Sequence, residues 1–363
     1  MKIAFVINDK RINLMGNEGC KLQIFNIINN LRKRKCKVKI IQQKNNSNFV
    51  LRSIKLALKC KGSDLIHERY SLYSIAGFLA SRIFNTPLIV DVDAPLPYEV
   101  SLFWKIKFSK FQEAIINLTS KITLNQAKAV TTVSEETKAY LIKKWGISPN
   151  KIFVIPNGVK TDIFSKKFNE KKIRENYNLK SDIVIMFVGS LKPWSGINNL
   201  IKSFYEAKKN IKKIKLFIVG GGEEKNDIEN EISKLGLEGS VILTGNVPHQ
   251  RIPELLSFAD IAVLPYSRIK NFYFSPLKLF EYMAARKAII ASDQGQISRT
   301  IKHGETGILF EPGNIKELSE AIISLSRNKK KRLFLGKKAF LDVKGRTWGS
   351  FTRKLLEVYN YKQ

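Results

Sequence analysis

Short runs of β-branched and aliphatic residues alternate with longer amphipathic stretches along most of this chain. That alternation is typical of an α/β domain with a parallel sheet. It restarts after the turn sequence Pro156-Asn157-Gly158, so it predicts two doubly wound domains in succession. The predicted strands are residues 3–7, 38–41, 64–67, 88–90 and 130–133, followed by residues 183–188, 215–219, 241–244, 261–264 and 288–291.

The length of 363 residues also favours two domains, because a single core usually stops growing near about 300 residues. The polar stretch 160–171 is the predicted interdomain linker. We therefore expect a first domain over residues 1–165 and a second over residues 166–345. Ligands of open α/β sheets bind beyond the carboxyl ends of the strands, so two such domains would face each other across a cleft lined by loops from both.

The net charge of +32 is spread along the chain rather than gathered in a tail. Such a field favours anionic partners, which include phospholipid headgroups, nucleic acid and nucleotide-linked substrates, without choosing among them. An AT-rich coding sequence would also enrich lysine, and that is the simpler source of part of the excess. No apolar run reaches about 18 residues, and Cys20, Cys36 and Cys60 have neither metal-ligand nor disulfide spacing. We therefore expect a cytoplasmic protein.

One short segment places a lysine and a carboxylate at the start of an apolar helix. Ser275 is the expected N-cap and Pro276 the expected first helical residue, followed by Leu277, so free N–H groups there would face an anion. Lys278 and Glu281 share one helical face. The ammonium could meet phosphate oxygens while the carboxylate accepts hydrogen bonds from sugar hydroxyls. The simpler interpretation is an ion pair on the protein surface.

Glycine-containing loops follow the first strand of each predicted domain. In the first domain, Gly16 and Gly19 would let N–H groups approach a phosphate, although a plain strand-to-helix turn explains them equally well. In the second domain, Lys192 is the only fixed cation of the loop, and we assign it to a diphosphate, with a solvated lysine as the alternative. Asn246 and Val247 follow a later strand, where backbone groups could read the edge of a nucleobase.

Several motifs recur in a fixed order through the second half of the chain. They are Pro156-Asn-Gly-Val, Gly189-Ser-Leu-Lys-Pro-Trp, Gly220-Gly-Gly, Thr244-Gly-Asn-Val-Pro, Ala259-Asp-Ile-Ala-Val-Leu-Pro, Ser275-Pro-Leu-Lys-Leu-Phe-Glu-Tyr-Met-Ala and Gly304-Glu-Thr-Gly-Ile-Leu-Phe. In that order they resemble glycosyltransferase family 4, in its Ser-Pro-Leu-Lys-Leu-Phe-Glu branch. Glu68-Arg69-Tyr70-Ser71, Asp91-Val-Asp-Ala-Pro and Val133-Ser-Glu resemble the same family less tightly.

The resemblance implies a GT-B fold, in which two Rossmann-like domains face each other. It also implies retaining transfer of a sugar from a nucleoside diphosphate donor, with no metal and no other cofactor. In such enzymes the first domain receives the acceptor and the second binds the donor. The C-terminal helix, residues 346–363 here, would pack back on the first domain.

The sequence departs from the family pattern at several positions. Where relatives carry the first glutamate of a pair, this chain has Tyr273, and the phosphate-loop arginine and lysine of relatives correspond to Ser190 and Ser195. The resemblance therefore implies that Lys192 and Lys278 supply most of the positive charge on the departing diphosphate.

Relatives often place a histidine near the donor sugar in the first domain, and here Asp93 or Glu99 lies in that neighbourhood. Asp91 and Asp93 also form an Asp-x-Asp pattern, the metal signature of an unrelated glycosyltransferase fold. Ala94-Pro95 provides a turn directly after the pair, which joint ligation of one ion would use. Because the two-domain pattern argues against that other fold, we expect no metal, with Asp93 facing the cleft and Asp91 structural.

Residues 101–116 carry Trp104, Phe108 and Phe111 at helical spacing, with lysines beside them. This pattern predicts one basic aromatic helix. It could contact an anionic membrane that holds a lipid-linked acceptor, or it could pack into its own domain with its lysines in water.

The resemblance implies a retaining hexosyltransferase of polysaccharide or glycolipid assembly in the cell envelope. Its partners would be a nucleotide-sugar donor and a glycan or lipid-linked acceptor, with no specific nucleic acid, and it could be peripheral at the inner face of the membrane. The alternatives are an epimerase or phosphorylase, a degenerate GT-B scaffold, and a basic nucleic-acid-binding or membrane-binding protein without transferase activity. The predicted catalytic residues are Lys192, Lys278, Glu281 and Asp93, and the predicted donor-binding residues are Gly16, Gly19, Ser190, Asn246, Val247, Tyr273, Ser275, Pro276 and Leu277.

Overall fold

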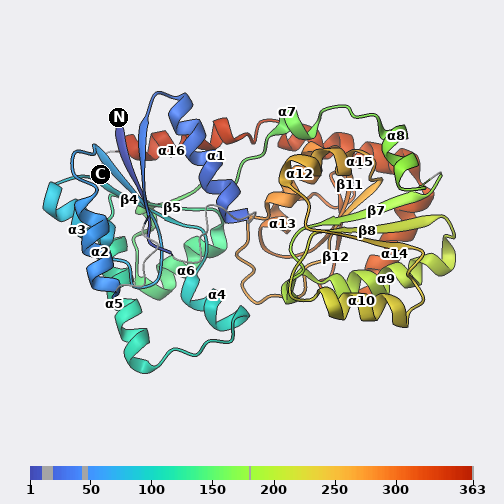
Figure 1. The fold of residues 1–363 in the computed structure, drawn as a ribbon, viewed down its shortest axis with the longest axis horizontal. Helices are drawn as coiled ribbons and strands as arrows, with labels where there is room; N and C mark the ends of the chain where they lie inside the picture. The colour runs from blue at the N-terminus through green and yellow to red at the C-terminus, as the bar shows by residue number, and fades with distance from the viewer. Residues whose placement is uncertain (10–18, 43–47, 180, 362–363) are drawn as a thin grey trace. The chain divides into compact units, whose positions relative to one another are not determined.

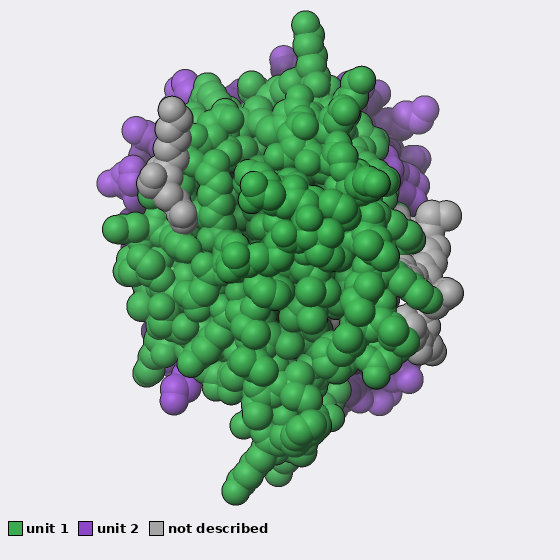
Figure 2. Space-filling model, turned by 90° about the vertical axis from the view of Figure 1, so that its left-hand side faces the viewer, with its two compact units in different colours: residues 1–157, 273–275, 348–363 green, residues 158–272, 276–347 purple. Residues whose placement is uncertain are grey.

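The computed structural model describes residues 1–9, 19–42, 48–179 and 181–361, which form two compact units (Figures 1 and 2). Unit 1 consists of residues 1–157, 273–275 and 348–363, and unit 2 consists of residues 158–272 and 276–347. The chain first leaves unit 1 at Asn157–Gly158, inside the predicted turn and ahead of the boundary expected at residue 165. Residues 160–171, predicted as a linker, belong to unit 2.

Unit 1 contains a parallel six-stranded sheet with the order β2-β1-β3-β4-β5-β6. The strands are β1 (Lys2–Ile7), β2 (Lys37–Gln42), β3 (Leu65–Arg69), β4 (Leu88–Val92), β5 (Ala129–Thr132) and β6 (Ile152–Val154). The helices are α1 (Gly19–Lys33), α2 (Phe49–Leu58), α3 (Ala76–Phe84), α4 (Leu96–Phe103), α5 (Lys110–Gln126), α6 (Glu135–Trp145) and α16 (Trp348–Asn360), with the 3-10 turn η1 (Pro149–Lys151).

Helices cover both faces of this sheet (Figure 1). On one face, side chains of α2, α3, α5 and α6 pack with alternate strand residues such as Ala4, Val6 and Val90 into a single apolar cluster. On the other face, α1 and α16 contact each other, and the Tyr359 hydroxyl of α16 lies 2.7 Å from His67 Nδ1 of β3. Burial lowers the pKa of His67 to about 4, so this histidine is a neutral core residue.

Unit 2 contains a second parallel six-stranded sheet with the order β12-β11-β10-β7-β8-β9. The strands are β7 (Ile183–Val188), β8 (Ile214–Val219), β9 (Val241–Gly245), β10 (Ile261–Leu264), β11 (Ala288–Ser292) and β12 (Ile308–Phe310). The helices are α7 (Thr161–Phe164), α8 (Glu170–Asn176), α9 (Ile197–Asn210), α10 (Lys225–Lys234), α11 (Ile252–Ser257), α12 (Leu277–Ala284), α13 (Gly295–Thr300), α14 (Ile315–Arg327) and α15 (Lys329–Val343), with 3-10 turns η2 (Pro193–Ser195) and η3 (His249–Arg251).

The predicted α/β class and each predicted strand are confirmed, and the terminal amphipathic helix is confirmed as α16. The strands β6 and β12 were not predicted. Each has only three residues, which is too short for a clear period-two pattern.

The prediction of one helix over residues 101–116 is wrong. Helix α4 ends at Phe103, Lys105 has a φ of 52°, and α5 begins only at Lys110. Ser109 caps α5 by accepting a hydrogen bond from Gln112 N, while the Gln112 side chain accepts one from Ser109 N. This capping box fixes a helix start in the middle of the segment. None of the helices in residues 1–9, 19–42, 48–179 and 181–361 combines the length and the hydropathy of a membrane-spanning segment.

Candidate functional site

The loops at the carboxyl ends of β7, β8 and β9 pack backbone against backbone. Gly220 N donates a hydrogen bond to Gly245 O at 3.0 Å, and Leu191 N donates to Gly221 O at 3.0 Å. A Cβ at Gly220, whose φ is 138°, would clash with the carbonyl of Gly189, and one at Gly222 would clash with the carbonyl of Leu191. The glycines therefore let the three loops interlock at this edge of the sheet, and this interlocked set of loops is called the glycine floor.

Lys278, in the first turn of α12, projects its ammonium toward this floor. The side chain is half-buried, and Nζ lies 4.3 Å from the ring centroid of Phe187 and 5.4 Å from that of Tyr266. A Cβ at Gly189 would collide with Nζ, so this glycine is also required for the position of the lysine. Burial lowers the pKa of Lys278 to about 8, although Glu281 raises it.

No carboxylate among the described residues forms an ion pair with Lys278. Aromatic faces stabilise an ammonium only modestly compared with a direct counter-ion. The site therefore holds a partly desolvated cation that would gain from an arriving anion such as a phosphate.

Glu281 lies one turn further along α12 and faces the end of β9. Its Oε1 is 2.7 Å from Nε2 of His249, which opens η3, and the ring of Phe164 from α7 packs edge-on against that imidazole at 5.9 Å. The side chain of Glu281 is 12% exposed, and its second oxygen has no hydrogen-bond partner among the described residues. One carboxylate oxygen is thus held in place while the other can accept hydrogen bonds from a ligand.

The remaining unit 2 candidates lie on the rim of the floor. Lys192 Nζ pairs with Glu223 Oε2 at 3.3 Å on the protein surface, so its charge is partly compensated. Ser190 is exposed, and Ser195 is buried, where its hydroxyl donates to the Ser190 carbonyl at 2.8 Å and thereby braces the loop. The exposed Asn246 places its amide beside Gly221.

Val247 follows the strand β9 directly after Asn246 and is half-buried. Pro276 and Leu277 mark the start of α12. Gly19 is the first residue of α1, and Gly16 lies outside the described residues.

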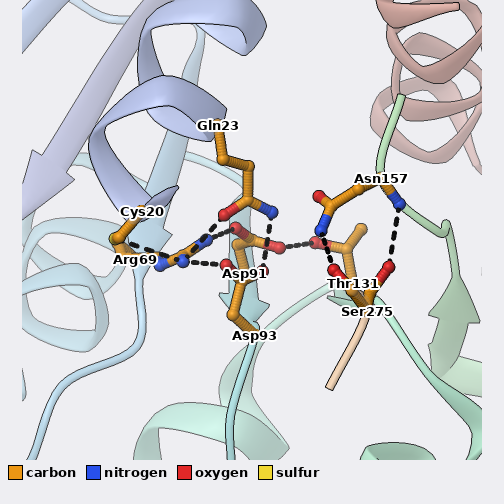
Figure 3. Close-up of polar contacts among 8 residues, drawn as sticks. All are labelled: Cys20, Gln23, Arg69, Asp91, Asp93, Thr131, Asn157 and Ser275. Atoms are coloured by element: carbon orange, nitrogen blue, oxygen red, sulfur yellow. Dashed lines mark hydrogen bonds and ion pairs between the residues drawn. The ribbon is translucent and has the colours of Figure 1, made fainter. Parts of the chain in front are cut away.

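The expected N-cap is corrected by one residue: Pro276 is the N-cap of α12, and the helix begins at Leu277. Pro276 has a ψ of 111°, which is extended rather than helical. Ser275 instead belongs to unit 1, where its hydroxyl accepts a hydrogen bond from Asn157 N at 3.4 Å and its carbonyl accepts one from Asn157 Nδ2 at 3.0 Å (Figure 3). Ser275 therefore anchors the chain before the helix and does not cap it.

Tyr273 is likewise buried in unit 1. Its carbonyl accepts a hydrogen bond from Ser134 Oγ at 2.8 Å, and its ring packs edge-on against Tyr98 of α4 at 6.3 Å. Burial, followed by the charge of nearby Glu99, raises the pKa of Tyr273 well above its usual value. The position where relatives carry a glutamate is therefore a neutral core position in this chain.

In unit 1, a buried arginine joins the carboxyl ends of β3 and β4 (Figure 3). Arg69 Nη1 donates to Asp91 Oδ2 at 2.5 Å, and Nη2 donates to Asp93 Oδ2 and, at 2.9 Å, to Gln23 Oε1. Gln23 Nε2 in turn donates to Asp93 Oδ1 at 2.9 Å, and Thr131 Oγ1 donates to Asp91 Oδ1 at 2.8 Å. The two carboxylates thus share one guanidinium.

The two aspartates differ in access. The Asp91 side chain is 4% exposed and that of Asp93 is 21% exposed, because β4 ends between them. Burial raises the pKa of Asp93 to about 6, with Arg69 lowering it and Asp91 raising it. Because its side chain is the more exposed of the two, Asp93 is the member of this network that a ligand can reach.

The described residues contain no group of three or more His, Cys, Asp or Glu side chains that could hold a metal ion.

Sequence reasoning missed Arg69, Gln23 and the pairing of His249 with Glu281. Arg69 stands in a quoted motif, Glu68-Arg69-Tyr70-Ser71, where a charged residue at the end of a predicted buried strand was an available signal. No local sequence pattern indicated that His249 pairs with Glu281, because the two residues lie 32 positions apart.

Two parallel six-stranded Rossmann-like sheets, with a glycine floor at one of them, define the class of protein as GT-B. The family model described as Glycosyl transferases group 1 matches residues 169–342, and the one described as Glycosyltransferase Family 4 matches residues 31–163. The chain belongs to glycosyltransferase family 4 and is therefore a glycosyltransferase.

Relatives and solved structures agree with this assignment. The chain is 30% identical over 310 residues to the N,N'-diacetylbacillosaminyl-diphospho-undecaprenol alpha-1,3-N-acetylgalactosaminyltransferase of Campylobacter jejuni, covering 84% of this chain and 78% of that protein. It is 26% identical over 281 residues to the uncharacterized glycosyltransferase MJ1069 of Methanocaldococcus jannaschii, covering 76% of this chain and 69% of that protein. The crystal structure of Anabaena Alr3699/HepE in complex with UDP matches with a TM-score of 0.80 at 19% identity, over 99% of this chain and all of that one.

Proposed function

We propose that this chain transfers a sugar, with retention of configuration, from a nucleoside diphosphate sugar to a lipid-linked or glycan acceptor, without a metal. The observation that carries the proposal is the ammonium of the half-buried Lys278, which has no counter-ion among the described residues and lies beside the glycine floor. A nucleoside diphosphate supplies the anion that such a cation requires. Glu281, held by His249, would accept hydrogen bonds from the ribose hydroxyls.

The chemistry follows from the charge that develops during transfer. As the glycosidic bond breaks, negative charge grows on the β-phosphate, and Lys278, the rim cation Lys192 and the N-terminus of α12 would stabilise it. The departing diphosphate could then remove the proton of the attacking acceptor hydroxyl. In unit 1, Asp93 would accept a hydrogen bond from a sugar hydroxyl, because it is the accessible carboxylate of the Arg69 network.

The relatives suggest where to begin with substrates. The Campylobacter relative is named for a diphospho-undecaprenol-linked acceptor and an N-acetylgalactosaminyl group, and the Anabaena structure contains UDP. We therefore propose UDP-linked donors and polyprenyl diphosphate-linked acceptors as the first classes to screen, in the setting of glycolipid or polysaccharide assembly on the cytoplasmic side of the membrane.

Calorimetric titration with UDP, GDP and ADP in the presence of EDTA tests the donor site. We expect one nucleotide to bind selectively to the wild type, and Lys278→Met and Glu281→Gln each to weaken that binding at least tenfold, which corresponds to about 1.4 kcal/mol. The control pair is Lys209→Met and Glu206→Gln, an exposed lysine and glutamate on α9 with the same three-residue spacing, which should leave binding unchanged.

No selective binding, or equal loss in the control variants, would overturn the donor-site assignment and favour a degenerate scaffold. Once a donor and an acceptor are found, the anomeric configuration of the product, read by proton NMR, tests retention separately. Inversion would refute the retaining mechanism while leaving the donor site in place.

A further inference from the structure

A single glutamine side chain of unit 2 holds the segment that follows β10, residues 265–272. Gln294 lies two residues after β11 and is the N-cap of α13. Its Nε2 donates to the carbonyl of Ser267 at 2.9 Å and to that of Tyr266 at 3.4 Å. Its Oε1 accepts a hydrogen bond from Ile269 N at 3.1 Å. One side chain therefore binds three backbone groups of this segment, and it uses both the donor and the acceptor ends of its amide.

The next residue of α13 approaches the other end of the same segment, which is called the 265–272 loop. Gly295 has a φ of 53°, and a Cβ there would clash with the carbonyl of Phe272. The rings of Tyr266 and Phe272, both buried, pack edge-on with their centroids 5.2 Å apart. The start of α13 thus contacts the loop near both of its ends, through a side chain at one end and through backbone at the other.

The loop in turn contacts the surroundings of both predicted donor cations. The ring centroid of Tyr266 lies 5.4 Å from Nζ of Lys278. Ser267 N donates a hydrogen bond at 3.1 Å to the carbonyl of Trp194, which belongs to the same loop as Lys192. Tyr266 and Ser267 are the two residues whose carbonyls the glutamine binds. The hydrogen bonds of that one side chain therefore fix the residues through which the loop contacts the candidate donor site.

We propose that Gln294 is a positioning residue of the donor site, because it fixes the loop that places the Tyr266 ring over the ammonium of Lys278. The proposal rests on the proposed role of Lys278 in donor binding. Residues 265–272, all of which the structure describes, lie outside any helix or strand, so their backbone groups depend on side chains or water for hydrogen bonds. Methionine in place of Gln294 would fill a similar volume but leave three backbone groups unpaired, so the loop would leave this conformation.

The titration of Lys278 tests the position of the loop without any ligand. With the lysine Cε carbons isotope-labelled, the NMR signal that Lys278→Met removes is followed against pH, and the pKa expected in the wild type is about 8. In Gln294→Met the Tyr266 ring should move away and water should reach the ammonium. We therefore expect the pKa of Lys278 to rise, with a fall of at least about threefold in its acid dissociation constant. A merely structural role would lower the melting temperature without changing this pKa.

Calorimetric titration with UDP, GDP or ADP, whichever the wild type selects, measures the consequence for the donor site. Gln294→Met and Gln294→Glu should each weaken binding about threefold to tenfold. The glutamate keeps the length of the side chain and the acceptor for Ile269 N, but it repels the two carbonyls. The control is Gln126→Met, because Gln126 is a half-buried glutamine of unit 1 that accepts a hydrogen bond from Arg82 at 2.7 Å. It should change neither the pKa of Lys278 nor nucleotide binding.

An unchanged pKa of Lys278 in Gln294→Met, or an equal change in Gln126→Met, would overturn the proposal. Undiminished nucleotide binding in both Gln294 variants would overturn it as well, while the proposed function would stand. If the wild type selects none of the three nucleotides, the proposed function fails first and the positioning role fails with it. Melting temperatures show whether each variant is folded, and Gln294→Glu carries both measurements if Gln294→Met does not fold.

Discussion

Replacing Lys278 with methionine should stabilise the folded protein and at the same time abolish donor binding. The pKa of this lysine falls from 10.5 to about 8 on burial, and each pH unit corresponds to about 1.4 kcal/mol, so keeping it charged costs about 3 kcal/mol near neutral pH. Its contacts with the rings of Phe187 and Tyr266 return about 1 kcal/mol of that cost. Methionine has a similar shape and no charge, so we expect the free energy of unfolding to rise by about 2 kcal/mol.

The difference in the free energy of unfolding between the wild type and Lys278→Met should shrink as the pH rises. Above about 8 the native lysine loses its proton, whereas the unfolded chain keeps it up to about 10.5. The wild type should therefore gain stability as the pH rises through this window, because the unfolded state binds more protons there. The methionine variant lacks the group, so its advantage should be present at about pH 7 and nearly lost at about pH 10.

Urea unfolding of both proteins at about pH 7 and about pH 10, together with calorimetric titration of UDP, measures both effects. The control is Lys287→Met, because Lys287 is also half-buried but donates to Ser257 O at 2.6 Å and to Ala259 O at 3.0 Å. Removing that ammonium leaves two carbonyls unpaired, so this variant should lose about 1 to 3 kcal/mol.

The reasoning would be refuted if Lys278→Met were less stable than the wild type at neutral pH, or if the difference between them did not change with pH. Either result would mean that the ammonium of Lys278 is satisfied in the folded protein without a ligand. Unchanged UDP binding in a more stable variant would refute the role in the donor site but not the cost of burial.

Three further predictions follow from other contacts. His249→Ala should weaken UDP binding threefold to tenfold, because it releases the carboxylate of Glu281. His249→Gln should keep most of the wild-type affinity in the same titration. An equal loss of affinity in both variants would exclude a positioning role for His249. Gly220→Ala should lower the free energy of unfolding by about 2 to 4 kcal/mol, because the φ of Gly220 is 138° and a Cβ there would meet a backbone carbonyl. The control Gly239→Ala has open space around it and should change the urea midpoint little. Similar midpoints for the two variants would contradict the interlocked floor. Transferase activity should fall as the pH drops below about 6, where Asp93 takes up a proton. Asp93→Asn should remove this loss of activity from the acidic side of the pH profile. If the loss persists in the variant, it belongs to another titrating group.

The fold was largely predictable because period and composition repeat over whole strands. Runs such as Ile183–Val188 and Ile261–Leu264 are fully apolar and bounded by turns, which is the pattern of a strand buried on both faces. The strand Ile152–Val154 has too few residues for such a pattern. The start of α12 was misplaced because serine before proline is a common helix start, whereas here the serine is held by Asn157, far away in the sequence.

The candidate site was predictable only where its members are neighbours in the sequence. Lys278 and Glu281 lie on one helix, so their spacing alone places them on one side. Asp91, Asp93 and Gln23, the partners of Arg69, lie 22, 24 and 46 residues away from it, and His249 lies 32 residues from Glu281. Such pairings depend on how strands are ordered in the sheet, which a single sequence does not encode locally.

Neither unit corresponds to a continuous piece of the chain. A fragment covering residues 158–347 would carry the segment 273–275 without Ser134 and Asn157, whose hydrogen bonds hold the backbone of that segment. A fragment ending at residue 157 would lose α16 and with it Tyr359, the hydrogen-bond partner of His67. No single cut, whether by a protease or by a cloning boundary, therefore yields two halves with all their own contacts. Anyone who produces the donor-binding half by itself should expect to redesign the segment just before α12, and the boundary inferred from sequence motifs gives no warning of this.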